Sequence, residues 1–348
     1  MSFTVRVNQF DAPLVVETGE SILDAALKRD LPYPHGCRSG NCGACKSELL
    51  SGEVEMSPYS DFALTEAEKS SGLILACRAV PWSDCEVRFV EADETVVHPL
   101  RHMTGRVVEI ADLTHDIRRL RLAIVEGGPF TFTAGQYASL EFPGLPARDY
   151  SMANRPEEPL LEFHIRLVPG GSVTPVVATK LKTGDTLKVV GPYGTSYLRE
   201  KHTGPILALA GGSGLAPIKS IVETALEHGM RQPITFYFGV RGERDLYHLD
   251  YFQNLAARYP NLTVIAVLSE PRGPTQARTG FLADAIRTDF AGQGALGLDG
   301  AKAYLAGPPI MVETCVVAVE ALGVRKQDCH ADAFYTEADK AALTAKTA

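Results

Sequence analysis

Hydrophobic and polar positions in the first part of the chain alternate in a way that is typical of short β-strands. Residues 3–8 and 13–17 follow this two-residue period, and residues 72–80 form an apolar run long enough for a buried strand. Residues 22–28 show a helical pattern instead, and Ser21 directly before them is a suitable N-terminal cap. The pattern therefore predicts a small β-rich domain with one helix packed on its sheet.

The pattern changes at residues 91–103, where apolar periodicity lapses and His98-Pro99 interrupts regular structure. We interpret this segment as a linker. Short strands separated by turn residues follow it, at 105–110, 117–125, 136–142, 161–168 and 186–190. Strands of this length and spacing are typical of an antiparallel barrel.

Strands and helices alternate from residue 204 onward. The predicted strands are 205–210, 234–239, 262–268 and 302–306, and the predicted helices are 216–229, 245–259 and 310–322. Such alternation predicts a parallel sheet covered by helices. The expected fold is thus multidomain, α+β and α/β, with domains at 1–94, 95–201 and 202–348.

The formal net charge of −8 changes this picture because it is unevenly distributed. Residues 1–97 carry 16 acidic and 8 basic side chains, whereas the remaining residues carry 26 of each. The acidic excess either solvates the first domain or steers a redox partner with basic patches, and both interpretations stay open. The chain has no basic stripe and no apolar run of membrane-spanning length, so we expect neither a nucleic-acid nor a membrane partner.

Four of the seven cysteines form the most specific pattern of the chain. Cys37, Cys42 and Cys45 have the spacing C-x4-C-x2-C, and Cys77 follows later. This is the plant-type spacing for four thiolate ligands of a [2Fe-2S] cluster. Gly36, Gly40 and Gly43 can take positive φ and turn backbone N–H groups toward the sulfur atoms. A zinc site usually has two short cysteine or histidine pairs, and only one is present here.

Three cysteines remain outside this pattern: Cys85, Cys315 and Cys329. Their odd number argues for reduced thiols and a cytoplasmic location, since disulfides require an oxidising compartment.

Two short motifs in the barrel region suit a pyrophosphate. Arg148 lies in Arg-Asp-Tyr-Ser after the predicted strand 136–142, and its guanidinium can bind an anion through two hydrogen bonds. A glycine-rich turn at 170–171 precedes Thr174, which we expect to cap a helix that begins at Pro175. The N-terminus of a helix after such a turn offers unpaired N–H groups to an anion.

Two further glycine turns follow predicted strands of the parallel sheet. Residues 210–217 (Ala-Gly-Gly-Ser-Gly-Leu-Ala-Pro) match neither a dinucleotide fingerprint, nor a P-loop, nor a nucleophile elbow. They still form a strand–glycine loop–helix turn, as do residues 306–311 (Ala-Gly-Pro-Pro-Ile-Met). Because both turns lie at the carboxyl edge of one sheet, they predict a nucleotide-binding crevice there.

Together these motifs, in this order, resemble the NADH-dependent reductase components of bacterial ring-hydroxylating dioxygenases, in particular the naphthalene dioxygenase reductase type. The resemblance covers residues 1–335, and it includes the segments 114–121, 162–166 and 331–335. It implies a β-grasp [2Fe-2S] ferredoxin domain, a six-stranded antiparallel FAD barrel and an NAD-binding α/β domain.

The resemblance also implies individual roles. Arg148 would bind the flavin pyrophosphate, Tyr150 would lie against the flavin, and Ser151 would hydrogen-bond near N5, where hydride arrives. Ser151 and Phe334, which would cover the flavin, are the expected catalytic residues. The other expected cofactor-binding residues are His164, Arg166, Gly171, Val173, Thr174, Gly211, Gly212, Ser213, Gly214, Pro217, Arg241, Gly307, Pro308 and Met311.

The implied activity passes electrons from NADH through FAD and the cluster to a ferredoxin or to the terminal oxygenase, by a monomeric protein. Reductases of diiron monooxygenases or of deoxysugar synthesis, and a redox sensor or scaffold without turnover, are the alternatives. Many relatives have Cys-Gly where this chain has Ala306-Gly307, so we expect Ala306 to hold the nicotinamide less firmly. The choice between NADH and NADPH stays open, because Arg241 and Arg244 suit a 2′-phosphate whereas Glu243 and Asp245 suit a 2′-hydroxyl.

Overall fold

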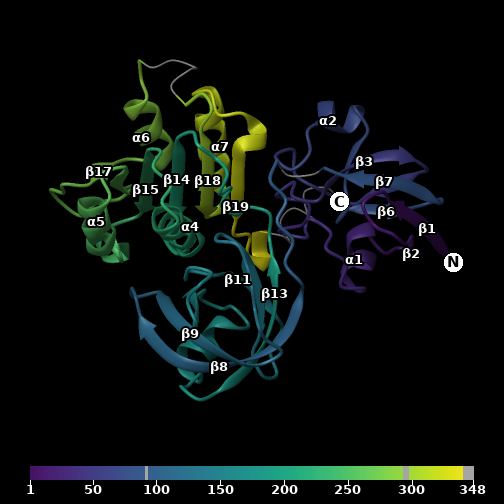
Figure 1. Ribbon diagram of the computed structural model, residues 1–348, viewed down its shortest axis with the longest axis horizontal. Helices are drawn as coiled ribbons and strands as arrows, with labels where there is room; N and C mark the ends of the chain where they lie inside the picture. Colours follow the sequence, from purple (N-terminus) through teal and green to yellow (C-terminus); the bar gives the residue numbers. More distant parts are fainter. Residues whose placement is uncertain (91–92, 293–297, 340–348) are drawn as a thin grey trace. The chain divides into compact units, whose positions relative to one another are not determined.

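The computed structural model describes residues 1–90, 93–292 and 298–339, which form two compact units (Figure 1). The first unit comprises Met1–Val97, the short segment Tyr193–Thr195 and the chain from Phe334 onward. The second unit comprises His98–Pro192 and Ser196–Ala333. The antiparallel and the parallel sheet lie together in the second unit, and the predicted boundaries at 94 and 201 stay predictions.

The first unit is built on a five-stranded sheet with the strand order β2-β1-β7-β3-β5. Its strands are β1 (Ser2–Val7), β2 (Leu14–Glu17), β3 (Lys46–Ser51), β5 (Leu73–Leu75) and β7 (Cys85–Phe89). Strands β1 and β7 are parallel and the remaining neighbours are antiparallel. A separate strand pair, β4 (Val54–Met56) with β6 (Ala79–Pro81), and two short helices, α1 (Ile22–Leu27) and α2 (Glu66–Ser70), complete the unit.

Helix α1 confirms the helix predicted at 22–28 together with its cap. The Ser21 hydroxyl accepts a hydrogen bond from the backbone N–H of Asp24 at 3.1 Å. Ile22 and Leu23 are fully buried in the core of this unit. The single strand predicted at 72–80 is wrong, because β5 ends at Leu75 and the chain turns before β6.

The second unit begins with a six-stranded antiparallel sheet in the order β11-β10-β13-β8-β9-β12. Its strands are β8 (Arg101–Asp112), β9 (Ile117–Glu126), β10 (Tyr137–Glu141), β11 (Arg148–Ser151), β12 (Leu161–Arg166) and β13 (Thr186–Tyr193). An isolated bridge between Met152 and Phe163 links the two edge strands, so the sheet is a nearly closed barrel. Strand β8 begins at Arg101, within the segment 91–103 that we interpreted as a linker.

The remainder of the second unit is a six-stranded parallel sheet in the order β17-β16-β15-β14-β18-β19. The strands are β14 (Ile206–Gly211), β15 (Ile234–Val240), β16 (Leu262–Leu268), β17 (Arg278–Thr279), β18 (Lys302–Gly307) and β19 (Cys329–Ala333). Chain order runs outward from β14 in one direction and from β18 in the other, so the topology switches between these two central strands. In such sheets, ligands bind at the carboxyl ends of the strands beside the switch.

Helices cover the parallel sheet as predicted, with differences in detail. They are α4 (Leu215–Glu227), α5 (Leu249–Arg258), α6 (Leu282–Asp289) and α7 (Pro309–Ala321), and α4 packs on β14 and β18 (Figure 1). The helix predicted at 245–259 begins only at Leu249, because Glu243–Asp245 form a 3-10 turn and His248 has φ of +56°. Among the described residues, no helix combines the length and the apolar character needed to cross a bilayer.

Candidate functional site

The four predicted cluster cysteines lie together in the first unit. Backbone N–H groups of Ser39 and Asn41 point at the Cys37 sulfur, at 3.5 and 3.3 Å, and the Cys37 N–H points at the Cys42 sulfur at 3.3 Å. The Cys77 N–H lies 3.5 Å from the Cys45 sulfur. Cys77, although far away in the sequence, therefore lies beside the loop that carries the other three cysteines. N–H groups aimed at sulfur stabilise thiolate ligands.

Glycines allow this loop to close around the sulfur atoms. Gly40 and Gly43 have φ of +77° and +76°, and a Cβ on Gly40 would lie 2.9 Å from the Tyr59 Cβ. Gly36 does not have the positive φ that we expected. A Cβ on Gly36 would instead lie 3.1 Å from the Cys42 sulfur, so its small size leaves room beside a ligand.

The four thiols perturb one another's protonation. The hydrogen bond from Cys42 lowers the pKa of Cys37 to about 5, and the bond from Cys77 lowers the pKa of Cys45. The same pairings, together with burial, raise the pKa of Cys42 and of Cys77 well above the ordinary value. Positive charge beside the four sulfur atoms, such as iron ions supply, favours their thiolate forms. This donor set fits a [2Fe-2S] cluster.

The other cysteines lie elsewhere, and all seven are free thiols. Cys85 belongs to β7, where its thiol lies 3.2 Å from the Ser83 carbonyl oxygen. Cys315 and Cys329 lie on α7 and β19 of the second unit.

The two barrel motifs predicted to meet a pyrophosphate are neighbours. A guanidinium N–H group of Arg148, on β11, lies 3.4 Å from the hydroxyl oxygen of Ser172, which directly follows Gly171. Tyr150 lies on the same strand, and burial raises the pKa of its phenol to about 12. The structure thus brings Arg148 and the 170–174 turn together, although they are more than twenty residues apart.

The helix after this turn differs from the prediction. Helix α3 (Thr174–Thr179) already includes Thr174, and Val173 is its N-terminal cap residue without a side-chain hydrogen bond. The Thr174 hydroxyl instead lies 2.9 Å from the Val168 nitrogen and 3.1 Å from the Val168 carbonyl oxygen. It therefore closes the turn rather than capping the helix.

The two glycine turns of the parallel sheet pack directly on each other at the switch between β14 and β18. A Cβ on Gly214 would lie 2.1 Å from the Ala306 carbonyl oxygen, and a Cβ on Gly211 would lie 2.4 Å from the Met311 sulfur. Gly307 has φ of +146°, and a Cβ there would lie 2.8 Å from the Gly211 carbonyl oxygen. A side chain at any of these three glycines would collide with the facing turn, so glycine allows the two turns to pack against each other.

Ser151, the residue predicted to lie nearest the reacting flavin atom, contacts the parallel sheet. Its hydroxyl donates to a carboxylate oxygen of Asp332, on β19, at 3.2 Å. Phe334 follows two residues after Asp332 and belongs to the first unit. The roles of Ser151 and Phe334 stay predictions, as do those of Pro217, Pro308 and the exposed Arg241.

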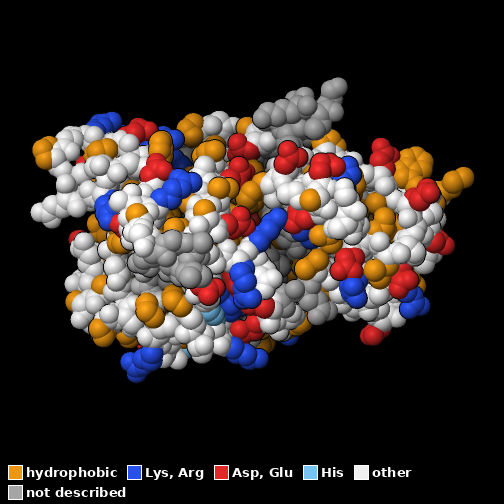
Figure 2. All heavy atoms as spheres, turned by 90° about the horizontal axis from the view of Figure 1, so that it is seen from above, with side chains coloured by type: hydrophobic (Ala, Val, Ile, Leu, Met, Phe, Trp, Pro, Cys, Tyr) orange, Lys and Arg blue, Asp and Glu red, His pale blue; other side chains and the backbone are white. Residues whose placement is uncertain are grey.

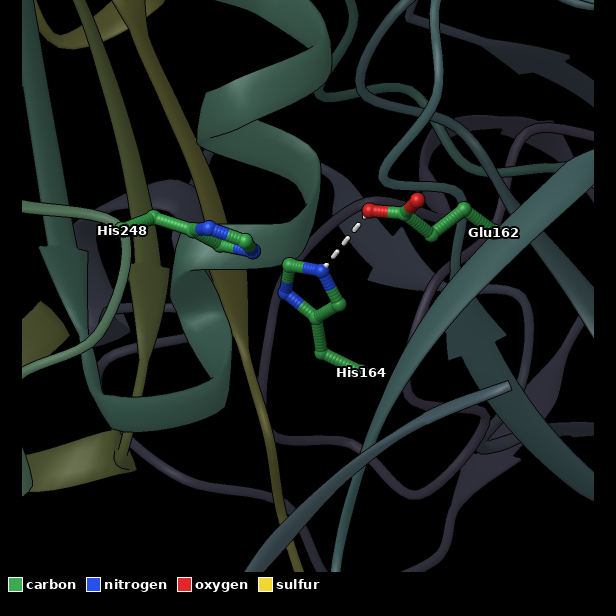
Figure 3. A group of neighbouring side chains, drawn as sticks. All are labelled: Glu162, His164 and His248. Atoms are coloured by element: carbon green, nitrogen blue, oxygen red, sulfur yellow. Dashed lines mark hydrogen bonds and ion pairs between the residues drawn. The ribbon is translucent and has the colours of Figure 1, made fainter. Parts of the chain in front are cut away.

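His164 and Arg166, also predicted to bind cofactor, have partners within the protein. The His164 side chain is fully buried, and its Nε2 lies 3.1 Å from a Glu162 carboxylate oxygen (Figure 3). Arg166 donates to Asp116 at 3.2 Å. Both ring nitrogens of His164 are engaged, since Nδ1 lies 3.2 Å from the Tyr247 hydroxyl, so any effect of His164 on a cofactor passes through these partners.

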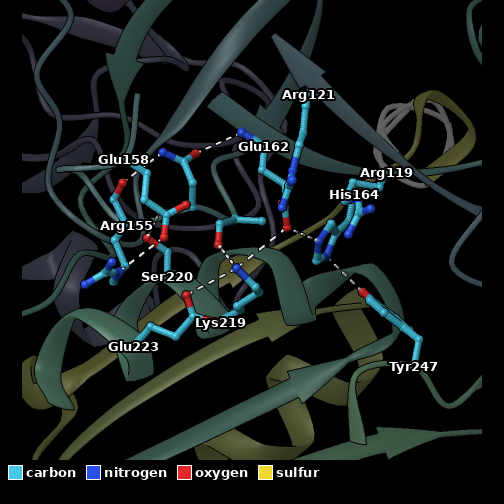
Figure 4. A network of polar contacts seen from close by, with 12 residues as sticks. Arg119, Arg121, Arg155, Glu158, Glu162, His164, Lys219, Ser220, Glu223 and Tyr247 are labelled. Carbon is cyan, nitrogen blue, oxygen red and sulfur yellow. Dashed lines mark hydrogen bonds and ion pairs between the residues drawn. The ribbon is translucent and has the colours of Figure 1, made fainter. Parts of the chain in front are cut away.

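Glu162, His164 and His248 have ligand atoms within 4.8 Å of one another, which invites comparison with a metal site. The charges around them disfavour a cation. Lys219 lies 3.6 Å from Glu162, and Arg121 donates to the other Glu162 oxygen at 2.8 Å (Figure 4). Lys219 and Arg121 therefore already supply the positive charge beside Glu162 that a metal ion would otherwise supply.

Sequence reasoning missed four polar residues around these sites: Glu162, Lys219, Tyr247 and Asp332. Lys219 had a detectable signal, because it follows four apolar residues at the start of α4, and the structure buries it. A lysine is almost never buried without partners. The other three became recognisable only through contacts across the fold.

Comparisons with known proteins agree with this geometry. Residues 5–81 match a 2Fe-2S iron-sulfur cluster binding domain, residues 104–197 an oxidoreductase FAD-binding domain, and residues 208–316 an oxidoreductase NAD-binding domain. These matches confirm the predicted cofactors and the fold of each part.

Full-length relatives share all three parts. The chain is 42% identical, over 94% of its length and 98% of the relative, to the ferredoxin–NAD(P)+ reductase component of naphthalene 1,2-dioxygenase/salicylate 5-hydroxylase systems from Ralstonia. It is 35% identical to the phenol 2-monooxygenase reductase component from Pseudomonas, over all of this chain and 99% of the relative. A crystal structure of an Amycolatopsis cytochrome P450 reductase superposes with a TM-score of 0.77 at 38% identity, covering 95% of this chain and 98% of that one. With the cysteine loop, the barrel motifs and the paired glycine turns in place, the chain belongs to the family of iron–sulfur flavoprotein reductases that includes the ferredoxin–NAD(P)+ reductase component of naphthalene dioxygenase systems.

Proposed function

We propose that this reductase takes electrons from NADH and delivers them, through its [2Fe-2S] cluster, to a ferredoxin or to the terminal oxygenase of an aromatic ring-hydroxylating dioxygenase. One observation carries the proposal. The same chain matches an NAD-binding domain, where electrons would enter in pairs, and holds a four-cysteine loop suited to single electrons. When bound, FAD accepts hydride and releases single electrons, which is the chemistry that joins the two sites.

The residues of the chain bind and orient the cofactors. Arg148 supplies positive charge beside the 170–174 turn, where the flavin pyrophosphate is proposed to lie. The Gly211–Gly214 turn and Gly307, at the carboxyl ends of β14 and β18, are proposed to hold the nucleotide. Ser151, positioned by Asp332, presents its hydroxyl at the proposed meeting point of flavin and nicotinamide.

The acidic first unit is proposed to be the surface that meets the electron acceptor. Figure 2 shows carboxylates spread over this unit, at the right of the view, with few Lys and Arg side chains among them. This distribution agrees with the 16 acidic and 8 basic side chains of residues 1–97. An acceptor with basic patches would be steered toward it, and the steering would weaken with salt.

The proposed partner can be tested by reconstitution. We would mix the purified reductase with NADH and with matched oxygenase components, and follow oxidation of naphthalene, of salicylate and of phenol. Turnover with a dioxygenase supports the proposal. Turnover only with a phenol monooxygenase would assign the chain to a diiron system instead, which the 35% identical relative makes the main alternative.

We further propose that the protein works as a monomer in the cytoplasm, without nucleic acid. Seven free thiols suit a reducing compartment. Sedimentation of the holoprotein would test the monomer, and comparison of NADH with NADPH as electron donor would test the proposed preference for NADH.

A further inference from the structure

Tyr247 connects the glycine loop of the parallel sheet to the buried histidine of the barrel. Its hydroxyl lies 3.2 Å from the Gly212 carbonyl oxygen and 3.2 Å from Nδ1 of His164. The side chain is 6% exposed, and its ring packs edge-on against Phe238 and His164. One hydroxyl has one proton, so Tyr247 can donate to only one of these two acceptors at a time.

The neighbouring carboxylate determines which nitrogen of His164 carries a proton. Burial opposes ionisation of Glu162, but the hydrogen bond from His164 and the charges of Lys219 and Arg121 hold its pKa well below the ordinary value. Ionised Glu162 only accepts hydrogen bonds, so Nε2 of His164, at 3.1 Å, must be the donor. In neutral His164, Nδ1 is then an acceptor, and the Tyr247 hydroxyl can donate its hydrogen bond either to Nδ1 or to Gly212. In protonated His164, Nδ1 is a donor, and Tyr247 must donate to Gly212.

The Gly212 carbonyl matters because it shares a peptide unit with the N–H of Ser213. In a trans peptide the N–H points opposite to the carbonyl, so a bond that fixes the Gly212 oxygen also fixes the direction of the Ser213 N–H. Gly212 has φ of +54°, a conformation from which glycine moves easily. Ser213 and its neighbours are the proposed contacts of the NADH pyrophosphate.

We propose that Tyr247 is a positioning residue for the nucleotide loop, and that protonation of His164 turns the Tyr247 hydroxyl toward Gly212 and so couples nucleotide binding to pH. The inference rests on the proposed function, in which the Gly211–Gly214 loop holds NADH.

The surroundings of His164 fix the sign of this coupling. Its charged and titratable neighbours are Glu162 on β12, Arg119 on β9, Lys219 on α4, and Tyr247 and His248 before α5. Burial lowers the pKa of His164, with partial compensation by Glu162, so the free protein holds it neutral near pH 7. A bound dinucleotide would place negative phosphates beside the Gly212 turn, which Tyr247 connects to His164. Negative charge there favours the protonated state of His164. Nucleotide binding should therefore tighten as pH falls.

The test is the dissociation constant of NAD+, which binds without reducing the flavin, measured from pH 8 to pH 6 on the FAD-loaded holoprotein. We expect the constant to fall about fivefold in the wild type, within the usual range of coupling between two sites. Tyr247→Phe keeps the ring but removes the hydroxyl, so its dissociation constant should be higher at pH 6 and nearly independent of pH. His164→Gln, which cannot titrate, should flatten the profile as well.

Tyr259→Phe is the matched control, because it removes a hydroxyl that donates to Glu227 on the surface, at 3.0 Å. It should keep the wild-type profile. An unchanged pH dependence in Tyr247→Phe would overturn the inference while ferricyanide reduction by NADH continued to support the proposed function. Loss of NADH oxidation by the wild-type holoprotein itself would instead contradict the proposed function.

Discussion

Replacing Lys219 by Met tests whether the buried polar network holds the nucleotide domain on the barrel. The Lys219 ammonium lies 3.0 Å from the Ala153 carbonyl oxygen of the barrel, and 3.2 Å from Glu223 on its own helix α4. The next residue of α4, Ser220, donates to the Asn154 carbonyl oxygen at 2.7 Å. These contacts attach the helix that follows the glycine loop to the barrel (Figure 4).

The expected loss in the free energy of unfolding depends on the groups that remain buried after Lys219→Met. Methionine fills the space of the lysine stem, so the packing loss is small. Glu223 is 5% exposed, and one of its oxygens already has no hydrogen-bond partner among the described residues. Removing one member of a buried ion pair costs about 3–5 kcal/mol, because the remaining charge stays buried. We expect a loss of about 3 kcal/mol in the free energy of unfolding of the second unit at pH 8.

The loss should shrink as pH falls. Burial raises the pKa of Glu223, and removing Lys219 raises it further. A carboxyl group whose folded pKa lies above its unfolded pKa gains stability as pH falls through the folded value, since the folded state takes up the proton. The deficit of Lys219→Met relative to the wild type should therefore be smaller at pH 6 than at pH 8.

Urea unfolding of the FAD-loaded holoprotein, followed by flavin fluorescence, measures this loss as a shift of the midpoint. Lys188→Met is the matched control, because its ion pair with Glu141 is exposed, with 71% and 43% of the side chains accessible. An exposed pair of this kind contributes about 0–1 kcal/mol. Equal midpoint shifts for the two variants, or a Lys219→Met deficit that grows at low pH, would refute the reasoning.

Three further predictions concern the cofactor sites. Cys77→Ser should abolish or strongly destabilise the iron–sulfur absorption, whereas Cys85→Ser should leave it intact, and the opposite pattern would reject the ligand assignment. Arg148→Ala should weaken FAD binding about tenfold or more, since a lost bond to a charged group costs roughly 1.5–3 kcal/mol. An unchanged flavin dissociation constant would remove Arg148 from the site. Ala306→Cys should speed hydride transfer in stopped-flow measurements, and an equal or slower rate would mean that the nicotinamide is already well held.

Local patterns were sufficient to predict those regular elements whose signals lie in consecutive residues. The helix at 22–28 has its apolar spacing and its Ser21 cap in consecutive residues, and both are found. The position of Cys77 beside the cysteine loop was also predictable, because the spacing of the four cysteines is typical of the ligands of a [2Fe-2S] cluster. The helix is determined by consecutive residues, and the cysteine spacing is determined by the cluster that the cysteines are predicted to bind.

Features that depend on distant partners could not be predicted. Strand β17 has only two residues, Arg278 and Thr279, and it exists because it pairs with β16. The turn before α5 follows from burial of Tyr247 against the barrel, which interrupts the helical pattern that the sequence continues to show. Glu162, Lys219 and Tyr247 come from three separate segments and lie around His164 in the fold. Their spacing in the sequence does not indicate this proximity.

In the proposed function, electrons enter the reductase as a pair from NADH and leave singly through the cluster. The most direct measurement adds one equivalent of NADH to the anaerobic FAD- and iron-loaded protein, and records the flavin absorbance together with the EPR spectrum of the cluster. We expect the flavin to bleach and the EPR signal of a reduced [2Fe-2S] cluster then to appear in the wild type but not in Cys77→Ser. A flavin that bleaches while the wild-type cluster stays oxidised, even with an oxygenase acceptor turning over, would contradict the proposed function.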